Sequence, residues 1–236
     1  QSLGIDAIWF SPFFTSPDLD FGYDIEDYCA IDPRYGTMED FNCLLEEAHR
    51  RNIMVMLDLV VNHTSSSHSW FRESRSGWQN PKRNWYIWKD GRAGGKKPPN
   101  NWRNNFFGPA WSKDESTGQY YLHSFLNEQP DLNWANREVR DEIGQVIRFW
   151  LERGVDGFRL DVAHIYCKDQ QFRDNPPFFY PRKKSGSGSC FDRTWQANFF
   201  RFFSLPEFQV RRYTQHQPET HHVLKEFRCI FNQYPA

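Results

Sequence analysis

The stretch that decides the fold is GFRLDV at residues 157–162. It is typical of a short β-strand, and side chains alternate across a strand, so Arg159 and Asp161 share one face. The apolar side chains, Val162 among them, share the other face and are expected to pack outward on helices. A guanidinium lowers the pKa of a nearby carboxyl, so we expect Asp161 to stay ionised at neutral pH. Such a carboxylate suits a covalent nucleophile, although a structural buried ion pair would give the same pattern.

A second predicted strand, residues 53–61, is apolar on both faces, as the strands of a parallel sheet are. Asp58 interrupts this strand, and a charge buried there is costly unless it is paired. We expect Arg159, on the inner face of another strand, to be its partner. His63 lies at the exit of the strand, where a neutral imidazole could donate to a sugar hydroxyl. Taken alone, a histidine in that position is more often an ordinary loop residue.

The first predicted strand, residues 5–10, is followed by the tight turn DFGYD at residues 20–24. This turn brings the carboxylates of Asp20 and Asp24 and the phenol of Tyr23 to one rim of the sheet. Taken by itself, the turn also fits an ordinary Asp/Gly turn with a core tyrosine.

Helical periodicity separates these strands. One stripe begins after Thr37, a residue type that suits an N-cap, and others cover residues 139–151 and 223–231. Alternating strands and helices predict a parallel α/β fold. Residues 63–132 show no sustained helical period and are rich in Trp, Pro and Asn. We interpret this stretch as an irregular inserted domain with its own small core.

The fold class we predict is α/β, a partial TIM (β/α)8 barrel. A complete barrel takes about 250 residues, roughly 31 per unit, whereas the insertion alone uses 70 of the 236 residues here. The irregular stretch after Val162 uses about 50 more, and the roughly 115 residues that are left support three or four units, so we expect strands two to four. The predicted barrel part comprises residues 1–62 and 133–236, with the inserted domain at 63–132. Both ends of the chain fall between elements, which predicts an internal fragment.

Composition excludes several other classes of protein. The 29 Lys and Arg residues against 30 Asp and Glu give no basic excess, so no nucleic-acid partner is expected. No apolar run approaches the ~20 residues that a membrane helix needs. The five cysteines are odd in number and lack metal spacing, which predicts reduced thiols and a cytoplasmic protein. An aromatic share of 18% suits either a large core or a surface that stacks flat, hydroxylated ligands.

Together, these segments resemble the conserved regions of glycoside hydrolase family 13, the α-amylase family. Residues 58–63, DLVVNH, are similar to its first conserved region, and residues 157–161 are similar to its second, which carries the nucleophile. Residues 129–133, QPDLN, resemble the additional segment that marks the oligo-1,6-glucosidase and α-glucosidase branch. The resemblance covers residues 1 to about 177 and resumes near residue 212.

The resemblance implies hydrolysis of α-glucosidic bonds in short oligosaccharides by a retaining double displacement. It also implies a barrel whose insertion, called domain B, follows the third strand. Matching positions imply three kinds of role, namely catalytic, substrate-binding and supporting. Asp161 would be the nucleophile with Arg159 as its orienting partner, Asp20, Tyr23 and His63 would bind the sugar, and Asp24 and Asp58 would support them.

The family's general acid, a Glu after the fifth strand, has no counterpart in this chain. A retaining glycosidase needs two carboxyl groups about 5 Å apart, so we expect the 236 residues alone to be inactive. No cofactor and no metal are expected at the site residues. Any Ca²⁺ or Mg²⁺ site would belong to an N-terminal loop that the chain lacks.

Two alternatives remain open. One is a glucosyl transferase or isomerase of the same family, such as a trehalose- or sucrose-converting enzyme. The other is a non-catalytic relative, the heavy chain of an amino-acid transporter. Retention of the catalytic and sugar-binding positions argues against it, namely Asp161, Arg159, His63, Asp20 and Tyr23. Val162, directly after the nucleophile, is a residue type often found with α-1,6 activity. The Phe-rich stretch 178–211 departs from the family pattern and has no assigned role.

Overall fold

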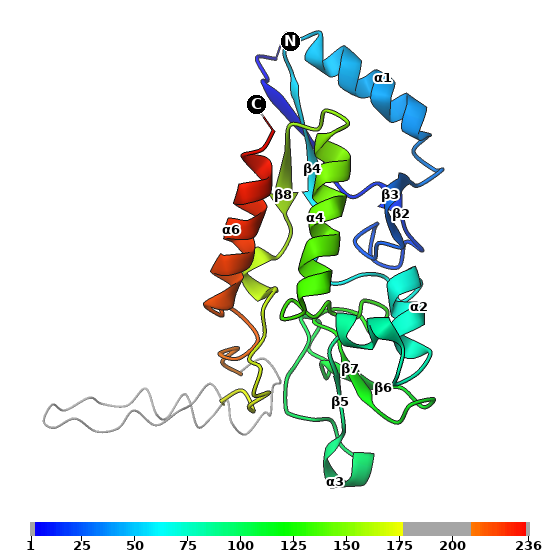
Figure 1. Ribbon diagram of the computed structural model, residues 1–236, viewed down its shortest axis with the longest axis vertical. Helices are drawn as coiled ribbons and strands as arrows, with labels where there is room; N and C mark the ends of the chain where they lie inside the picture. The colour runs from blue at the N-terminus through cyan, green and yellow to red at the C-terminus, as the bar shows by residue number, and fades with distance from the viewer. Residues whose placement is uncertain (1–2, 177–208, 235–236) are drawn as a thin grey trace, which may run out of the picture.

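The computed structural model describes residues 3–176 and 209–234, and its main sheet has three parallel strands (Figure 1). Their order is β1 (Ala7–Phe10), β4 (Met54–Leu59) and β8 (Gly157–Leu160). In the β4–β8 register, Asp58 lies opposite Arg159. Within the described residues, β1 and β8 each have one edge without a strand partner, so the barrel is partial and not closed.

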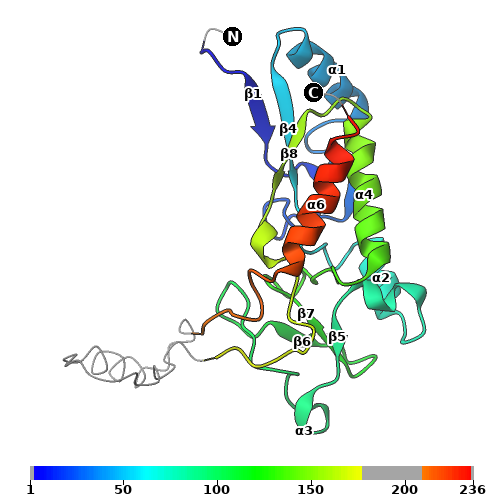
Figure 2. The same ribbon diagram turned by 60° about the vertical axis from the view of Figure 1, so that its left-hand side comes forward.

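Three helices predicted from hydrophobic stripes accompany this sheet. Helix α1 (Met38–His49) begins at Thr37, whose side chain and backbone both bond to Asp40 in a capping box. Helix α4 (Arg137–Leu151) begins at Asn136, whose side chain accepts from the Glu138 N–H, and α6 (Glu219–Phe231) follows Pro218. Helices α4 and α6 lie side by side, next to β4 and β8 (Figures 1 and 2). The sequence predictions for all three helices are confirmed.

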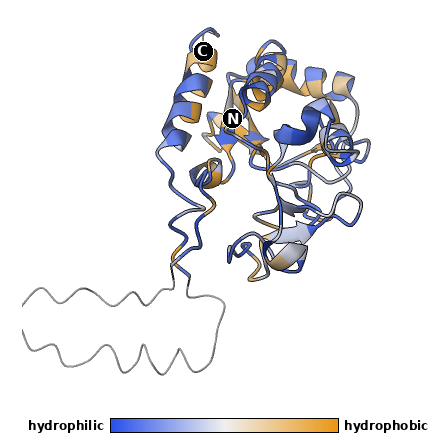
Figure 3. Cartoon of the chain, turned by 60° about the horizontal axis from the view of Figure 1, so that its bottom comes forward, coloured by the Kyte–Doolittle hydropathy of each residue, from blue (hydrophilic) through white to orange (hydrophobic). Residues whose placement is uncertain are grey.

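The core of this part is aromatic, and Trp150 of α4 lies at its centre with no exposed surface. The rings of Phe13, Phe14 and Phe41 lie 6.2, 5.1 and 5.4 Å from the Trp150 ring. The indole N–H donates to the carbonyl of Tyr28 at 2.9 Å, so the buried donor is satisfied. Hydrophobic and hydrophilic residues alternate along the long helices (Figure 3), which lets one side of each helix face this core.

The strand predicted at residues 157–162 ends earlier, at Leu160. Val162 has a left-handed backbone with φ +41° and precedes the short 3₁₀ helix η2 (Ala163–Ile165). Outward packing is confirmed for Phe158, whose ring stacks on Phe231 of α6 at 5.9 Å. The same prediction is wrong for Val162, which lines a pocket, because strand alternation no longer sets side-chain direction once the strand has ended.

A second, small sheet was not predicted. Strand β2 (Phe14–Thr15) pairs antiparallel with β3 (Asp27–Ile31), with a shift in register between Phe14 and Thr15. The pairing closes the loop that carries the DFGYD turn. A strand of two residues is too short for its alternation to be visible in a sequence.

The inserted stretch folds around its own antiparallel sheet, in the order β5 (Trp88–Lys89), β7 (Tyr120–Leu122) and β6 (Trp111–Lys113). It also holds α2 (Ser69–Arg75), the 3₁₀ helix η1 (Pro81–Trp85) and α3 (Arg92–Gly95). A separate buried cluster that includes Trp102, Trp111 and Leu122 confirms the expected small core. The boundaries of domain B at residues 63 and 132 stay a prediction.

No helix in the described part of the chain has the length and apolarity needed to cross a bilayer. Most of the Phe-rich stretch 178–211 falls on residues 177–208, which lie outside the described residues.

Candidate active site

Two neighbouring strands bring charged groups together at their carboxyl ends. Arg159 Nη1 lies 2.5 Å from Asp58 Oδ2, and Arg159 Nη2 lies 3.0 Å from Asp161 Oδ1. The Tyr23 hydroxyl donates to Asp58 Oδ2 at 3.3 Å. The predicted pairing of Asp58 with Arg159 is therefore confirmed, and one guanidinium bridges two carboxylates.

These groups border a pocket of about 330 Å³. It opens where the ends of β4 and β8 meet the DFGYD turn and the inserted stretch. All five residues predicted to be catalytic or substrate-binding line it, together with three others: Asp20, Tyr23, His63, Arg159 and Asp161, with Val162, Phe106 and Phe125. The structure thus gathers the predicted set in one place, while the individual roles stay predictions.

The electrostatics differ from the sequence expectation in one respect. Arg159 does lower the pKa of Asp161, but burial raises it by more, so the net shift is upward. Burial likewise raises the pKa of Asp58 to about 6, although Arg159 and the Tyr23 hydroxyl oppose this rise. The expectation of a depressed pKa for Asp161 was wrong because it counted the ion pair and not the loss of water around the carboxylate.

Asp24 supports the DFGYD turn from behind. Its carboxylate is fully buried and accepts hydrogen bonds from the backbone N–H of Leu19 and Asp20 at 3.0 and 3.1 Å, and from the Ser16 hydroxyl at 3.0 Å. Gly22 has φ +89°, and a Cβ there would meet the Pro12 carbonyl at 2.8 Å, so glycine is required. Asp24 and Gly22 together fix the position of Asp20.

His63 is buried at the exit of β4, with 1% of its surface exposed. Its carbonyl accepts from the Tyr28 hydroxyl at 3.0 Å, and its Nε2 lies 3.2 Å from the Tyr23 carbonyl. Burial lowers the pKa of the imidazole, and nearby carboxylates only partly offset this effect. A neutral histidine suits hydrogen bonding to an uncharged hydroxyl.

The inserted stretch supplies residues that sequence reasoning missed. The ring of Phe125 lies 5.1 Å from His63, and Phe106 lies 6.1 Å from Phe125, so both aromatics flank the pocket. Gln129, the first residue of QPDLN, also reaches the site, because its Nε2 donates to Asp20 Oδ2 at 2.8 Å. The aromatic richness of the insertion was the available signal, but no spacing singled out these two rings.

A buried ion pair lies behind the pocket. Lys168 Nζ is 3.0 Å from Asp131 Oδ2 and 3.1 Å from Asn62 Oδ1, and it also donates to the Ile165 carbonyl. This ammonium joins the ends of β4 and β8 to the QPDLN segment. Among residues 3–176 and 209–234, no cluster of three His, Cys, Asp or Glu side chains is arranged to hold a metal ion.

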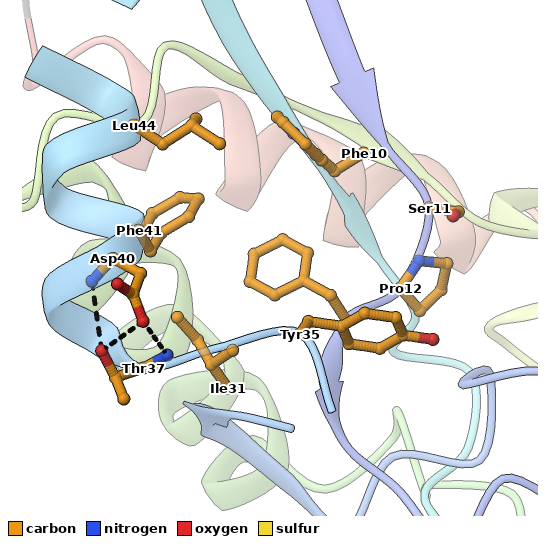
Figure 4. Close-up of a pocket in the computed structure, with 10 residues that line it drawn as sticks. Phe10, Ser11, Pro12, Ile31, Tyr35, Thr37, Asp40, Phe41 and Leu44 are labelled. Carbon is orange, nitrogen blue, oxygen red and sulfur yellow. Dashed lines mark hydrogen bonds between the residues drawn. The ribbon is translucent and has the colours of Figure 1, made fainter. Parts of the chain in front are cut away.

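A second pocket, also of about 330 Å³, lies between the end of β1 and helix α1 (Figure 4). Its walls are largely apolar and include Phe10, Phe41 and Leu44. The one carboxylate there, Asp40, is engaged by the backbone N–H and hydroxyl of Thr37 at 2.8 and 2.7 Å. This second pocket therefore lacks the cluster of charged side chains that lines the pocket at the strand ends.

This fold and site define a class of protein. The chain belongs to the α-amylase family, whose catalytic-domain description, "Alpha amylase, catalytic domain", matches residues 1–235. The strands are accordingly part of a (β/α)8 barrel, and the sequence-based family assignment is confirmed.

Particular relatives support the α-glucosidase branch of this family. A probable alpha-glucosidase of Rhizobium meliloti (strain 1021) is 47% identical over 234 residues, which cover 99% of this chain and 40% of the relative. An oligo-1,6-glucosidase of Heyndrickxia coagulans is 52% identical over 189 residues, covering 80% of this chain and 33% of that protein. The crystal structure of the alpha-glucosyl transfer enzyme XgtA matches with a TM-score of 0.84 at 46% identity, covering 99% of this chain and 41% of the other. The chain thus spans well under half the length of these proteins.

Proposed function

We propose that this chain carries the nucleophile half of a retaining α-glucosidase that hydrolyses short α-linked oligosaccharides. The observation that carries this proposal is the pocket in which Asp161 lies beside Arg159 and a buried, neutral His63. Similarity to α-glucosidases and to an oligo-1,6-glucosidase supports the substrate class.

The mechanism we propose is a double displacement. A carboxylate oxygen of Asp161 attacks the anomeric carbon, the glycosidic C–O bond breaks, and the leaving oxygen takes a proton from a general acid. Water then gives its proton to the same group, attacks the glucosyl ester and releases glucose with its original configuration. Arg159 orients Asp161, while Asp20, Tyr23 and His63 bind the sugar ring.

The general acid is proposed to come from outside the described residues. It must be a second carboxyl group about 5 Å from the nucleophile. In the described part of the chain, Asp20 is held by Gln129 and Asp58 by Arg159, so neither is free to shuttle a proton. A Glu from another barrel strand would complete the pair.

A fluorinated glucosyl trap tests the assignment. In a complete barrel that carries this chain, the reagent should form a stable glucosyl ester, which peptide mass spectrometry would locate on Asp161. A label on Asp58 or Asp24 would overturn the assignment, since the proposal makes both of them supporting groups.

Glucosyl transfer is the second candidate, and the similarity to the alpha-glucosyl transfer enzyme favours it. The two reactions share the glucosyl-enzyme intermediate and differ in the acceptor, which is water in one and a hydroxyl compound in the other. Products formed from maltose with added glycerol distinguish them, because a transferase yields glucosylglycerol in preference to glucose. A protein that releases neither product would revive the non-catalytic transporter-type alternative.

We further propose that no metal is needed at this site and that the protein works in the cytoplasm. The Lys168 ammonium already supplies positive charge to the oxygens of Asp131 and Asn62. The four cysteines in the described residues, Cys29, Cys43, Cys167 and Cys229, are unpaired thiols, which suits a reducing compartment.

A further inference from the structure

Gln129 occupies the space between two residues proposed to bind the sugar. It has no exposed surface, and its Nε2 lies 2.8 Å from Asp20 Oδ2 and 3.1 Å from His63 Nε2. Its other amide atom, Oε1, accepts from the backbone N–H of Leu126 at 3.1 Å. An N–H can only donate, so the oxygen must face Leu126 and the NH₂ group must face Asp20 and His63.

The hydrogen bonds around His63 also determine which of its nitrogens carries the proton. Lys168 donates to Asn62 Oδ1 at 3.1 Å, so the Asn62 NH₂ group is the one that lies 3.2 Å from His63 Nδ1. His63 Nδ1 therefore accepts, and the proton of the neutral ring sits on Nε2, which donates to the Tyr23 carbonyl at 3.2 Å. The NH₂ group of Gln129 thus faces another donor at His63 and bonds only to Asp20.

This arrangement has an electrostatic consequence. Without an intervening group, a histidine Nε2–H next to a carboxylate would normally form an Asp–His ion pair, because the carboxylate favours the protonated, charged imidazole. Such a pair would occupy the carboxylate of Asp20, which could then not accept from a sugar hydroxyl, and would draw the proton of His63 away from the Tyr23 carbonyl. The amide of Gln129 lies between them and satisfies the carboxylate with a donor that cannot titrate.

We propose that Gln129 is a positioning residue that keeps Asp20 and His63 from pairing, so that Asp20 keeps a carboxylate oxygen for a sugar hydroxyl and His63 keeps its hydrogen bond to the Tyr23 carbonyl. The binding role of those two groups rests on the proposed function, whereas their separation does not. The groups that act on the imidazole are the carboxylates of Asp20, Asp131 and Asp161, which favour its protonation, and the burial that opposes it. Removal of the Gln129 side chain should let Asp20 approach His63 and favour protonation of the imidazole.

The test is histidine NMR on a complete barrel that carries this chain, which reads the protonated nitrogen and the titration of His63 directly. Gln129→Ala should raise the pKa of His63 by at least one unit, a roughly tenfold gain in proton affinity. Gln129→Met retains the volume of the spacer and should leave the pKa near that of the wild type. Adding Asp20→Asn to Gln129→Ala should abolish the rise, because no carboxylate is then available to pair.

Controls separate this role from simple destabilisation. Gln119→Ala removes a half-buried amide of the same insertion, which accepts from Arg83 and donates to Asp90. This substitution should leave the pKa of His63 unchanged. The positioning role is overturned if His63 titrates alike in the wild type and in folded Gln129→Ala, or if Gln129→Met raises the pKa as much as alanine does.

Hydrolysis of p-nitrophenyl α-D-glucoside by the same complete barrel tests the proposed function separately. The KM should rise roughly tenfold in Gln129→Ala and remain unchanged in Gln119→Ala. Absence of glucoside hydrolysis by the wild type, with the His63 shift still present, would count against the proposed function while supporting the spacer.

Discussion

At the residue scale, burial and charge act in opposite directions on the carboxylates at the strand ends. Arg159 bonds to both Asp58 and Asp161 and lowers both pKa values. Burial raises both by more, because removing a carboxylate from water disfavours its charged form. The ion pairs therefore limit an upward shift without reversing it, which poises these groups to respond to pH.

Asp161→Ala should remove activity almost completely in a complete barrel that carries this chain. Without the carboxylate no glucosyl ester can form, so kcat should fall on the order of 10⁴-fold or more. Release of p-nitrophenol from an α-glucoside measures the effect. The exposed Asp27→Ala serves as the control and should retain wild-type kcat. A modest loss in Asp161→Ala would contradict the nucleophile assignment.

Asp58 should make stability depend on pH. Its folded pKa of about 6 lies above its ordinary value of 3.8, so the folded state holds the proton more tightly than the unfolded state does. The resulting stabilisation is present in full below pH 4 and is lost as pH rises through about 6, a change of about 1–3 kcal/mol. Urea unfolding at pH 4 and pH 7 measures it. Asp58→Asn should flatten the difference between the two pH values, and an equally steep dependence in that variant would assign the effect to another group.

At the element scale, the sequence predicted the helices and one distant ion pair, and it missed how the insertion packs over the strand ends. Helices α1 and α4 are predicted by their hydrophobic stripes and N-caps, and α6 by its stripe, since these signals lie within one or two turns of the chain. The pairing of Asp58 with Arg159 was also predictable, because a buried charge demands a partner. Phe106 and Phe125 were not, because nothing in a sequence fixes how an irregular insertion folds back over a strand end.

The cap of α1 offers a direct test at this scale. Thr37→Ala removes the hydroxyl that accepts the Asp40 N–H at 3.2 Å and leaves one donor of the first turn unpaired. The free energy of unfolding should fall by about 0.5–2 kcal/mol, measured by urea denaturation. Thr37→Ser keeps the hydroxyl and should stay within a few tenths of a kcal/mol of the wild type. Equal losses in both variants would show that the methyl group, and not the cap, stabilises this helix.

At the scale of the whole molecule, an open sheet carries a site built for a closed barrel. Strands β1 and β8 have free edges in the described part of the chain, and Trp9 on β1 is 49% exposed, with the Arg159 guanidinium 5.2 Å from its ring centroid. In addition, Asp58 Oδ1 and the Tyr166 hydroxyl are buried without a hydrogen-bond partner among the described residues. Such groups normally find one, so further barrel strands would both pair the edges and satisfy these atoms.

The 236-residue chain alone should therefore hydrolyse no α-glucoside. It presents the nucleophile Asp161, but in the described residues Asp20 and Asp58 are both engaged, and a single carboxyl group cannot complete a retaining displacement. The measurement is p-nitrophenol release by the purified chain, with a thermal melt recorded on the same sample. We expect no turnover and a broad melt, since unpaired sheet edges and unsatisfied inner groups weaken cooperativity. Measurable turnover would instead show that a carboxyl group of this chain replaces the missing Glu, with Asp24 and Glu115 the first to be tested by substitution, and a sharp melt would show that three strands and domain B suffice as a cooperative unit.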